Sequence, residues 1–94
     1  MIKTLEIQEK TLIDACLQGD RNAQCALYNK YAKAMFNICY RMMNNYSDAE
    51  DMLQEAFVKV FTQLDKYHYQ STLGAWIKRV VVNHCINHCR DVIK

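Results

Sequence analysis

The sequence contains no proline and only two glycines. Hairpins and tight turns depend on these residues, so the composition disfavours a β-sandwich, a β-barrel or an enzyme built on a glycine-rich phosphate-binding loop. No segment approaches the roughly 18 apolar residues of a membrane-spanning helix, and the mixed charges of the N-terminus do not fit a signal peptide. We therefore expect an all-α cytoplasmic protein with no membrane partner.

The chain of 94 residues, 51% hydrophobic and 23% charged, fits one small folded domain. A catalytic cleft between larger layers is hard to build at this length, and no serine or cysteine has a recognisable base and oxyanion donor. The five cysteines form an odd number without the spacing of a disulfide framework, so we interpret them as reduced thiols. The sequence favours a binding domain without a cofactor over an enzyme.

Apolar residues at helical spacing predict the first two helices. A short helix over residues 9–18 ends at Gly19, and Asp20 caps a long helix over about residues 22–43. This long helix carries a second apolar arc, formed by Cys25, Phe36, Tyr40 and Met43. It must therefore contact two surfaces, either both within the chain or one of them on a partner such as a second copy.

Two further long helices complete the predicted fold. A capping box from Ser47 to Glu50 marks the start of the third helix, whose apolar period stops at Asp65. Ser71 or Thr72 caps a fourth helix that reaches about residue 90. We expect a compact all-α bundle of three long helices and a short N-terminal helix, in a single domain over residues 1–94.

The middle of the chain is acidic, because residues 44–65 carry five acids and only one base. Projection at about 100° per residue places a polar ridge opposite the apolar stripe of the third helix. The ridge consists of Asp51, Gln54, Glu55, Val58 and Thr62. Carboxylates and an amide in this arrangement suit arginines on a partner helix. A solvated helix face is the alternative interpretation.

The last part of the chain is basic, because residues 66–94 carry five bases and a single acid. The same projection predicts an outward ridge on the fourth helix, beside Trp76, formed by Arg79, Asn83, Asn87 and Arg90. Guanidinium groups reach phosphates or guanine edges, and an asparagine amide both donates to and accepts from one base. Lys66, Lys78 and Lys94 add long-range attraction.

The segment before the fourth helix is an aromatic loop in which we expect exposed rings. It contains Tyr67, His68 and Tyr69, whose rings can stack on an unpaired base. The basic ridge and this loop together predict nucleic-acid binding on the side of the bundle opposite the acidic ridge. In the alternative, Tyr67 and Tyr69 fold over the core as a lid, and the chain is a helical protein–protein interaction module without DNA binding.

A zinc site formed by His84, Cys85, His88 and Cys89 is disfavoured. The four side chains point in different directions around the helix, and no other paired ligand is present. We therefore expect no metal, with a metal sensor built on His84 and His88 as a further alternative hypothesis.

Two segments of the sequence, LYNKYAKAMFNICYRMMNNYSDAEDMLQEAFVKVF and LGAWIKRVVVNHCINHCR, resemble a known family. They are similar to the second conserved region (region 2) of bacterial sigma factors of the extracytoplasmic-function (ECF) group. The stretch DAEDMLQEAFVKVF is the most specific part, and the resemblance runs from about Asp14 to Arg90. It implies a compact helical bundle that acts in transcription initiation and is not an enzyme.

The resemblance also implies two partners. In this family the acidic helix docks on the clamp helices of the largest subunit of RNA polymerase core, a role that falls here on Asp51, Gln54 and Glu55, with Val58 beside them. The loop and fourth helix recognise and melt the minus-ten promoter element and capture a flipped base of the single non-template strand. Matching positions for the capture loop are Tyr67, His68, Tyr69, Gln70 and Ser71, with Trp76 at its edge. Arg79 and Asn83 would face the DNA just upstream, and Arg90 would hold phosphate.

Two departures from the family pattern affect these expectations. Primary sigma factors have two adjacent aromatic residues where this chain has Trp76 and Ile77, which implies weaker strand opening. Full members carry a further domain, region 4, that reads the minus-thirty-five element. It is absent here, so we expect a fragment or an excised domain. An anti-sigma factor is an additional partner that the resemblance implies.

Overall fold

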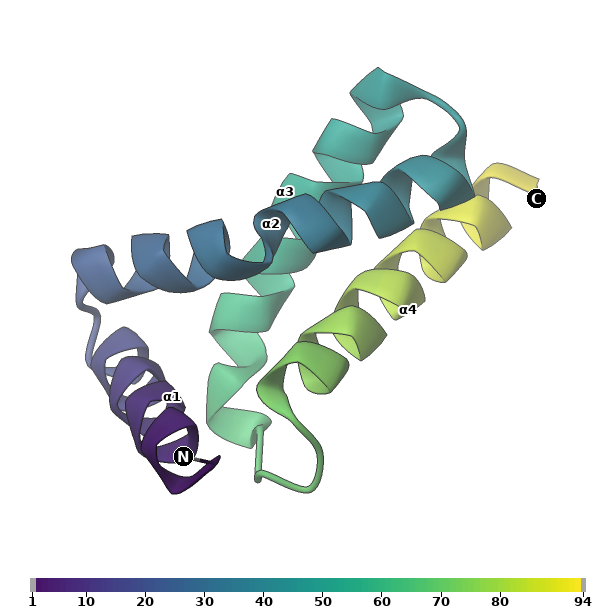
Figure 1. Ribbon diagram of the computed structural model, residues 1–94. Helices are drawn as coiled ribbons and strands as arrows, with labels where there is room; N and C mark the ends of the chain where they lie inside the picture. Colours follow the sequence, from purple (N-terminus) through teal and green to yellow (C-terminus); the bar gives the residue numbers. More distant parts are fainter. Residues whose placement is uncertain (1, 94) are drawn as a thin grey trace.

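The computed structural model describes the backbone of residues 2–93 and the side chains of residues 8–90. It contains α1 (Ile2–Leu17), α2 (Arg21–Met43), α3 (Tyr46–Gln63), the short 3₁₀ turn η1 (Leu64–Lys66) and α4 (Leu73–Ile93). Figure 1 shows α2 crossing α3 and converging with α4 toward the C-terminal ends of both helices, with α1 beneath the start of α2. The described backbone has no strand, which confirms the predicted all-α bundle.

The first helix is longer than predicted. It begins at Ile2 rather than near residue 9 and has 16 residues, so the expected short helix is wrong. Its predicted end is confirmed, because Gly19 has a φ of 88° in the left-handed region that glycine adopts readily. Oδ1 of Asp20 then accepts hydrogen bonds from the backbone N–H groups of Asn22 at 2.9 Å and Ala23 at 3.3 Å. These bonds confirm the predicted cap of α2.

Two asparagines connect α2 to α3. Asn44 has a φ of 58°, and its backbone N–H donates to the carbonyl of Tyr40 at 2.8 Å. Asn45 is extended, and its Oδ1 accepts from the N–H of Asp48 at 3.0 Å. The capping box predicted at Ser47 is therefore wrong, since α3 starts at Tyr46 with Asn45 as its cap. Asparagine tolerates the left-handed conformation, so the turn needs no glycine.

The start of α4 is fixed by Thr72. Its Oγ1 accepts from the backbone N–H of Ala75 at 3.2 Å, so Thr72 rather than Ser71 caps the helix. Within the described part of the chain, no helix is both long and apolar enough to cross a membrane.

The core lies where α2, α3 and α4 meet. Its largest fully buried side chains are Leu27, Cys39, Val60, Leu64, Leu73, Ile77, Val81 and Cys85. Full burial of a leucine or isoleucine contributes about 1.5–3 kcal/mol. The Sγ atoms of Cys39 and Cys85 are 3.8 Å apart, and both cysteines are free thiols. The core therefore fixes the rotation of α3 and α4 and, with it, the direction in which their outer faces point.

Candidate functional site

The acidic ridge of α3 faces outward, as predicted. Asp51, Gln54, Glu55 and Val58 are all exposed, Val58 by 63%. The opposite side of α3 is buried through Ala49, Met52, Leu53, Ala56, Phe57 and Val60. The ridge thus presents two carboxylates, one amide and one aliphatic side chain in a fixed orientation, which suits a partner helix carrying arginine and apolar residues.

Glu55 of this ridge also has a partner within the chain. Nε2 of His84 on α4 lies 2.9 Å from Oε1 of Glu55, whose side chain remains 57% exposed. Nδ1 of His84 is buried and has no hydrogen-bond partner among the described residues. His84 also lines a groove beside α4 together with Asn83 and Asn87 of the basic ridge. The two predicted surfaces therefore adjoin where α3 packs against α4. The expectation that they lie on opposite sides of the bundle is therefore wrong.

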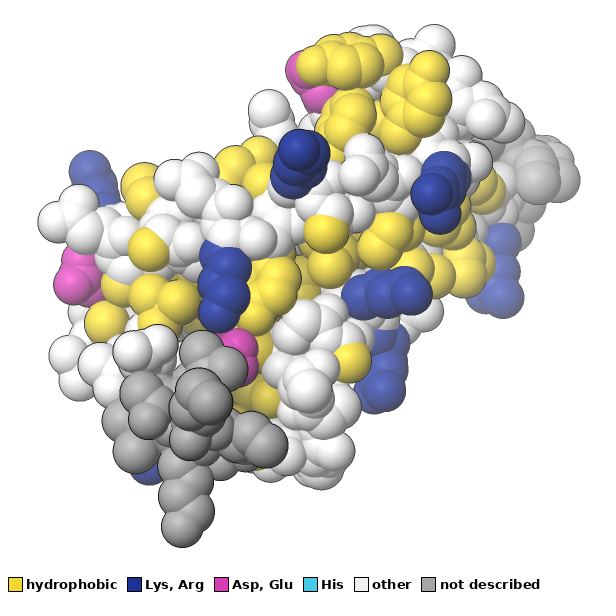
Figure 2. Space-filling model, viewed as in Figure 1, with side chains coloured by type: hydrophobic (Ala, Val, Ile, Leu, Met, Phe, Trp, Pro, Cys, Tyr) yellow, Lys and Arg dark blue, Asp and Glu magenta, His cyan; other side chains and the backbone are white. Residues whose placement is uncertain are grey.

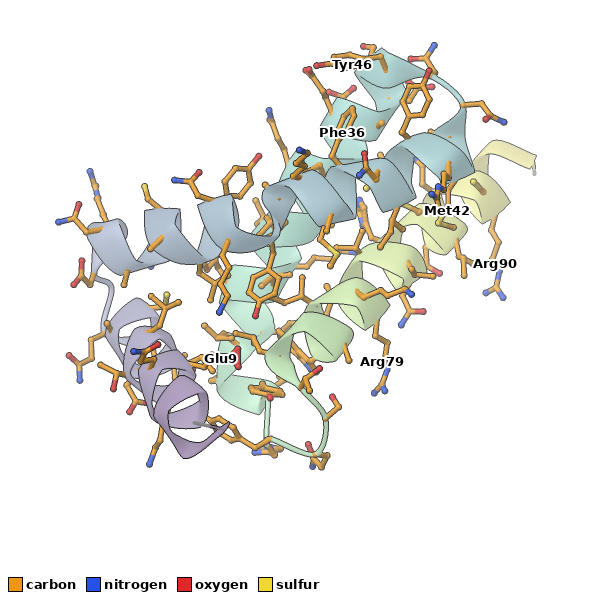
Figure 3. The ribbon with its side chains drawn as sticks, in the orientation of Figure 1. Glu9, Phe36, Met42, Tyr46, Arg79 and Arg90 are labelled. Atoms are coloured by element: carbon orange, nitrogen blue, oxygen red, sulfur yellow. The ribbon has the colours of Figure 1, made fainter. Side chains whose placement is uncertain are left out.

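The basic ridge of α4 is exposed along its length. Its exposed members are Lys78, Arg79, Asn83, Asn87 and Arg90. Figure 3 shows Arg79 and Arg90 projecting from the same side of α4, away from α2. A groove of about 310 Å³ runs beside the ridge, and Lys59 and Gln63 of α3 line it together with Asn83. Lys59 and Gln63 were not among the predicted site residues, because only the packing of α3 on α4 brings them to this groove.

Tyr67 organises the loop between η1 and α4. It is only 7% exposed, and its hydroxyl donates a hydrogen bond to the backbone carbonyl of Ser71. Its ring centre lies 4.7 Å from that of Tyr69 and 5.4 Å from that of the half-buried Trp76. Burial raises the pKa of Tyr67 above its usual value, which keeps the hydroxyl a donor. The expectation of an exposed ring is wrong for Tyr67, because its large apolar area packs against the bundle.

The rest of the loop faces solvent. Lys66, His68, Tyr69 and Gln70 are exposed, whereas Ser71 is half-buried. Tyr69 is 51% exposed and has a φ of 63°, a left-handed conformation that costs a bulky residue about 1–3 kcal/mol. Such strain persists only where neighbouring contacts enforce it, and here the buried Tyr67 holds the ring of Tyr69. One aromatic face is thereby presented at the surface.

A cavity of about 610 Å³ opens between this loop and α1. Glu9, Lys10 and Ile13 line it from α1, while Tyr69 and Gln70 line it from the loop. No residue of α1 was predicted to be functional, because nothing in the sequence spacing indicates that α1 packs beside the loop.

The aromatic residues of the second arc of α2 gather at the corner with α3. Phe36 is half-buried, and its ring centre lies 5.2 Å from that of Tyr46, which is 63% exposed. Tyr40, at 6.2 Å from Phe36, is also exposed. Figure 2 shows hydrophobic side chains grouped at this corner, and Figure 3 shows Phe36 and Tyr46 side by side there. The arc is thus covered by the chain only in part.

The histidine and cysteine cluster of α4 does not converge on one point. His84 contacts Glu55, whereas Cys85 is buried against Cys39. Among the side chains that the structure describes, no group of three or more His, Cys, Asp or Glu residues could hold a metal ion.

Comparison with known proteins identifies the family. The family model described as Sigma-70 region 2 matches residues 27–92. This chain belongs to the Sigma-70 region 2 family. The match contains all of α3, the loop and the acidic and basic ridges, and it confirms the resemblance drawn from the sequence.

Named relatives of this sigma region 2 chain are sigma factors. The chain is 29% identical over 86 residues to the ECF RNA polymerase sigma factor SigW of Bacillus subtilis, covering 92% of this chain and 46% of SigW. It is 28% identical over 81 residues to the RNA polymerase sigma-H factor of Pseudomonas aeruginosa, covering 86% of this chain and 42% of that protein. The chain therefore spans less than half the length of these relatives.

A solved structure has the same fold. It is the NMR structure of an engineered region 2 of sigmaE in complex with GTAAAA. The two chains superpose with a TM-score of 0.78 at 26% sequence identity, over 86% of this chain and 84% of the other.

Proposed function

We propose that this chain acts in bacterial transcription initiation by binding RNA polymerase core through α3 and the minus-ten promoter element through the loop and α4. Membership of the sigma region 2 family supports both roles. The observation that carries the proposal is the pair of exposed ridges on α3 and α4, acidic on one helix and rich in arginine and asparagine on the other. Such a protein would work in the cytoplasm, alongside the polymerase.

The docking half of the proposal rests on Asp51, Gln54, Glu55 and Val58. Asp51 and Gln54 are exposed and free to bind arginine through charge-assisted hydrogen bonds. Val58 lies one helical turn after Gln54, and its exposed aliphatic side chain offers an apolar contact to the same partner helix. Glu55 is shared, because His84 already contacts one of its oxygens.

The DNA half of the proposal rests on the loop and α4. In the proposed mechanism the cations Lys66, Lys78, Arg79 and Arg90 attract the phosphates, and Asn83 and Asn87 contact base edges in the groove beside α4. Tyr69 stacks on an extruded base of the non-template strand, and this contact offsets the few kcal/mol that unstacking costs. His68, Gln70 and Ser71 surround that base, and the buried Tyr67 and the half-buried Trp76 hold the loop in place. The related sigmaE domain in complex with GTAAAA supports this half.

Two binding measurements with the whole chain test the proposal. Asp51→Arg combined with Gln54→Ala should abolish binding to polymerase core and leave binding to a single-stranded oligonucleotide unchanged. Asp65→Arg is the matched control, because it makes the same charge change at an exposed site beyond the end of α3, and core binding should survive it. Equal loss of core binding in both variants, or retention in both, would contradict docking through the α3 ridge. No binding of the wild-type chain to single-stranded DNA would refute the DNA role and leave a protein-binding module.

A further inference from the structure

The cavity between α1 and the loop has the size and the mixed lining of a ligand site. Its volume of about 610 Å³ lies within the range of about 300–1,000 Å³ that small-molecule sites occupy. Ile13 gives it an apolar wall and Tyr69 an aromatic one, while Glu9 and Gln70 supply polar groups. This combination suits a flat heteroaromatic ring that stacks on one side and makes directional hydrogen bonds at its edge.

The carboxylate of Glu9 is held in place at this cavity. Its Oε2 accepts a hydrogen bond from the hydroxyl of Tyr31 at 3.2 Å and lies 3.7 Å from Nζ of Lys30. Its Oε1 has no hydrogen-bond partner among the described residues. Figure 3 shows Glu9 directed from α1 toward the rest of the bundle. One carboxylate oxygen thus anchors the side chain to α2, and the other is available to a ligand.

The loop presents the opposite wall in a fixed conformation. The strained left-handed backbone of Tyr69 turns its ring outward, and Tyr67 packs behind it at 4.7 Å. Glu9 and Tyr67 line the same cavity, and after burial the charge of Glu9 contributes to the raised pKa of Tyr67. The exposed Lys10, which also lines the cavity, is suited to a phosphate of the same nucleotide.

We propose that this cavity receives the extruded base and that Glu9 selects a base that carries an exocyclic amino group. An ionised carboxylate only accepts hydrogen bonds. The exposed edges of adenine, cytosine and guanine offer an amino donor, whereas thymine and uracil flank their single N–H with two carbonyl oxygens that the carboxylate repels. Glu9 is therefore a specificity-determining residue contributed by α1, a helix with no role in the docking and DNA ridges.

This inference rests on the proposed function, so the experiment separates the two. The whole chain is titrated with labelled single-stranded hexamers based on GTAAAA, in which each position in turn carries cytosine or uracil. These bases have the same ring and differ at C4, which carries an amino group in cytosine and a carbonyl oxygen in uracil, and at N3, which carries a hydrogen only in uracil. At one position cytosine should bind about tenfold more tightly than uracil, as expected for one charge-assisted hydrogen bond. N4,N4-dimethylcytosine at that position should bind as weakly as uracil.

Two variants assign the preference to Glu9. Glu9→Gln keeps an acceptor for Tyr31 and adds a donor, so the ratio between cytosine and uracil should fall to about threefold or less. Tyr31→Phe is the control, because it removes the tether and leaves the carboxylate, and it should keep most of the preference. Equal wild-type binding of cytosine and uracil at every position, or an unchanged ratio in Glu9→Gln, would overturn the inference while the proposed function stands. If the wild-type chain bound none of the hexamers, the proposed function itself would fail. The wild-type comparison stays decisive even if Glu9→Gln does not fold.

Discussion

The hydrogen bond from Tyr67 to the Ser71 carbonyl is expected to determine how firmly the loop is held. Tyr67→Phe removes the hydroxyl and keeps the ring, so the contacts with Tyr69 and Trp76 remain. The loss is then one neutral hydrogen bond, worth about 1 kcal/mol net. For a domain of this size, that corresponds to a fall in Tm of about 4–8 °C.

Thermal unfolding followed by circular dichroism measures this effect, and oligonucleotide titration measures its consequence for binding. We expect Tyr67→Phe to weaken binding of GTAAAA as well, because the loop that presents Tyr69 loses its anchor. Tyr69→Phe is the matched control, since its hydroxyl makes no hydrogen bond to a described residue, and its Tm should stay within about 2 °C of the wild type. An unchanged Tm in Tyr67→Phe, or an equal fall in Tyr69→Phe, would refute the assigned anchoring role.

Three further predictions concern the cap of α3, alkaline stability and phosphate contacts. Asn45→Ala should lower the free energy of unfolding, measured with urea, by about 1 kcal/mol, and Ser47→Ala should leave it almost unchanged. The reverse order would show that Ser47 rather than Asn45 caps α3. Burial raises the pKa of Tyr31 from 10, and that of the Cys39 thiol from 9, to about 12. The folded state therefore holds these protons more tightly than the unfolded state. The free energy of unfolding should be level below pH 9 and fall between pH 9 and 12. A level profile to pH 12 would contradict this. Arg90→Ala should reduce the salt dependence of single-strand binding by about 0.7 in the log–log slope, whereas Asn83→Ala should not change the slope.

Helical periodicity alone was enough to predict α2, α3 and α4 and the outward-facing residues of both ridges, but not how the two ridges lie relative to each other. Each of these helices has one strongly apolar face, and burying that face fixes the rotation of the helix. Asp51 and Arg79 are exposed for this reason, and Leu53 and Ile77, on the apolar faces of the same helices, are buried as predicted.

The errors arose where tertiary packing or turn chemistry decides. Tyr67 lies in a segment without periodicity, so only the fold shows that its ring is buried. Asn45 caps α3 because Asn44 ends α2 in the left-handed conformation, a local choice that competes with the equally good sequence signal at Ser47. The contact between Glu55 and His84 and the cavity beside Glu9 join residues far apart in the sequence, and a single sequence carries no sign of either.

The central claim is that one small bundle binds polymerase and single-stranded DNA through two adjoining surfaces. Size-exclusion chromatography of polymerase core from Bacillus subtilis, the source of SigW, with a labelled GTAAAA-containing strand tests it most directly. We predict that the label elutes with the core only when the wild-type chain is added, and that it elutes apart from the core when the chain carries Asp51→Arg and Gln54→Ala. A chain that elutes with the core while the labelled strand remains free would contradict the claim.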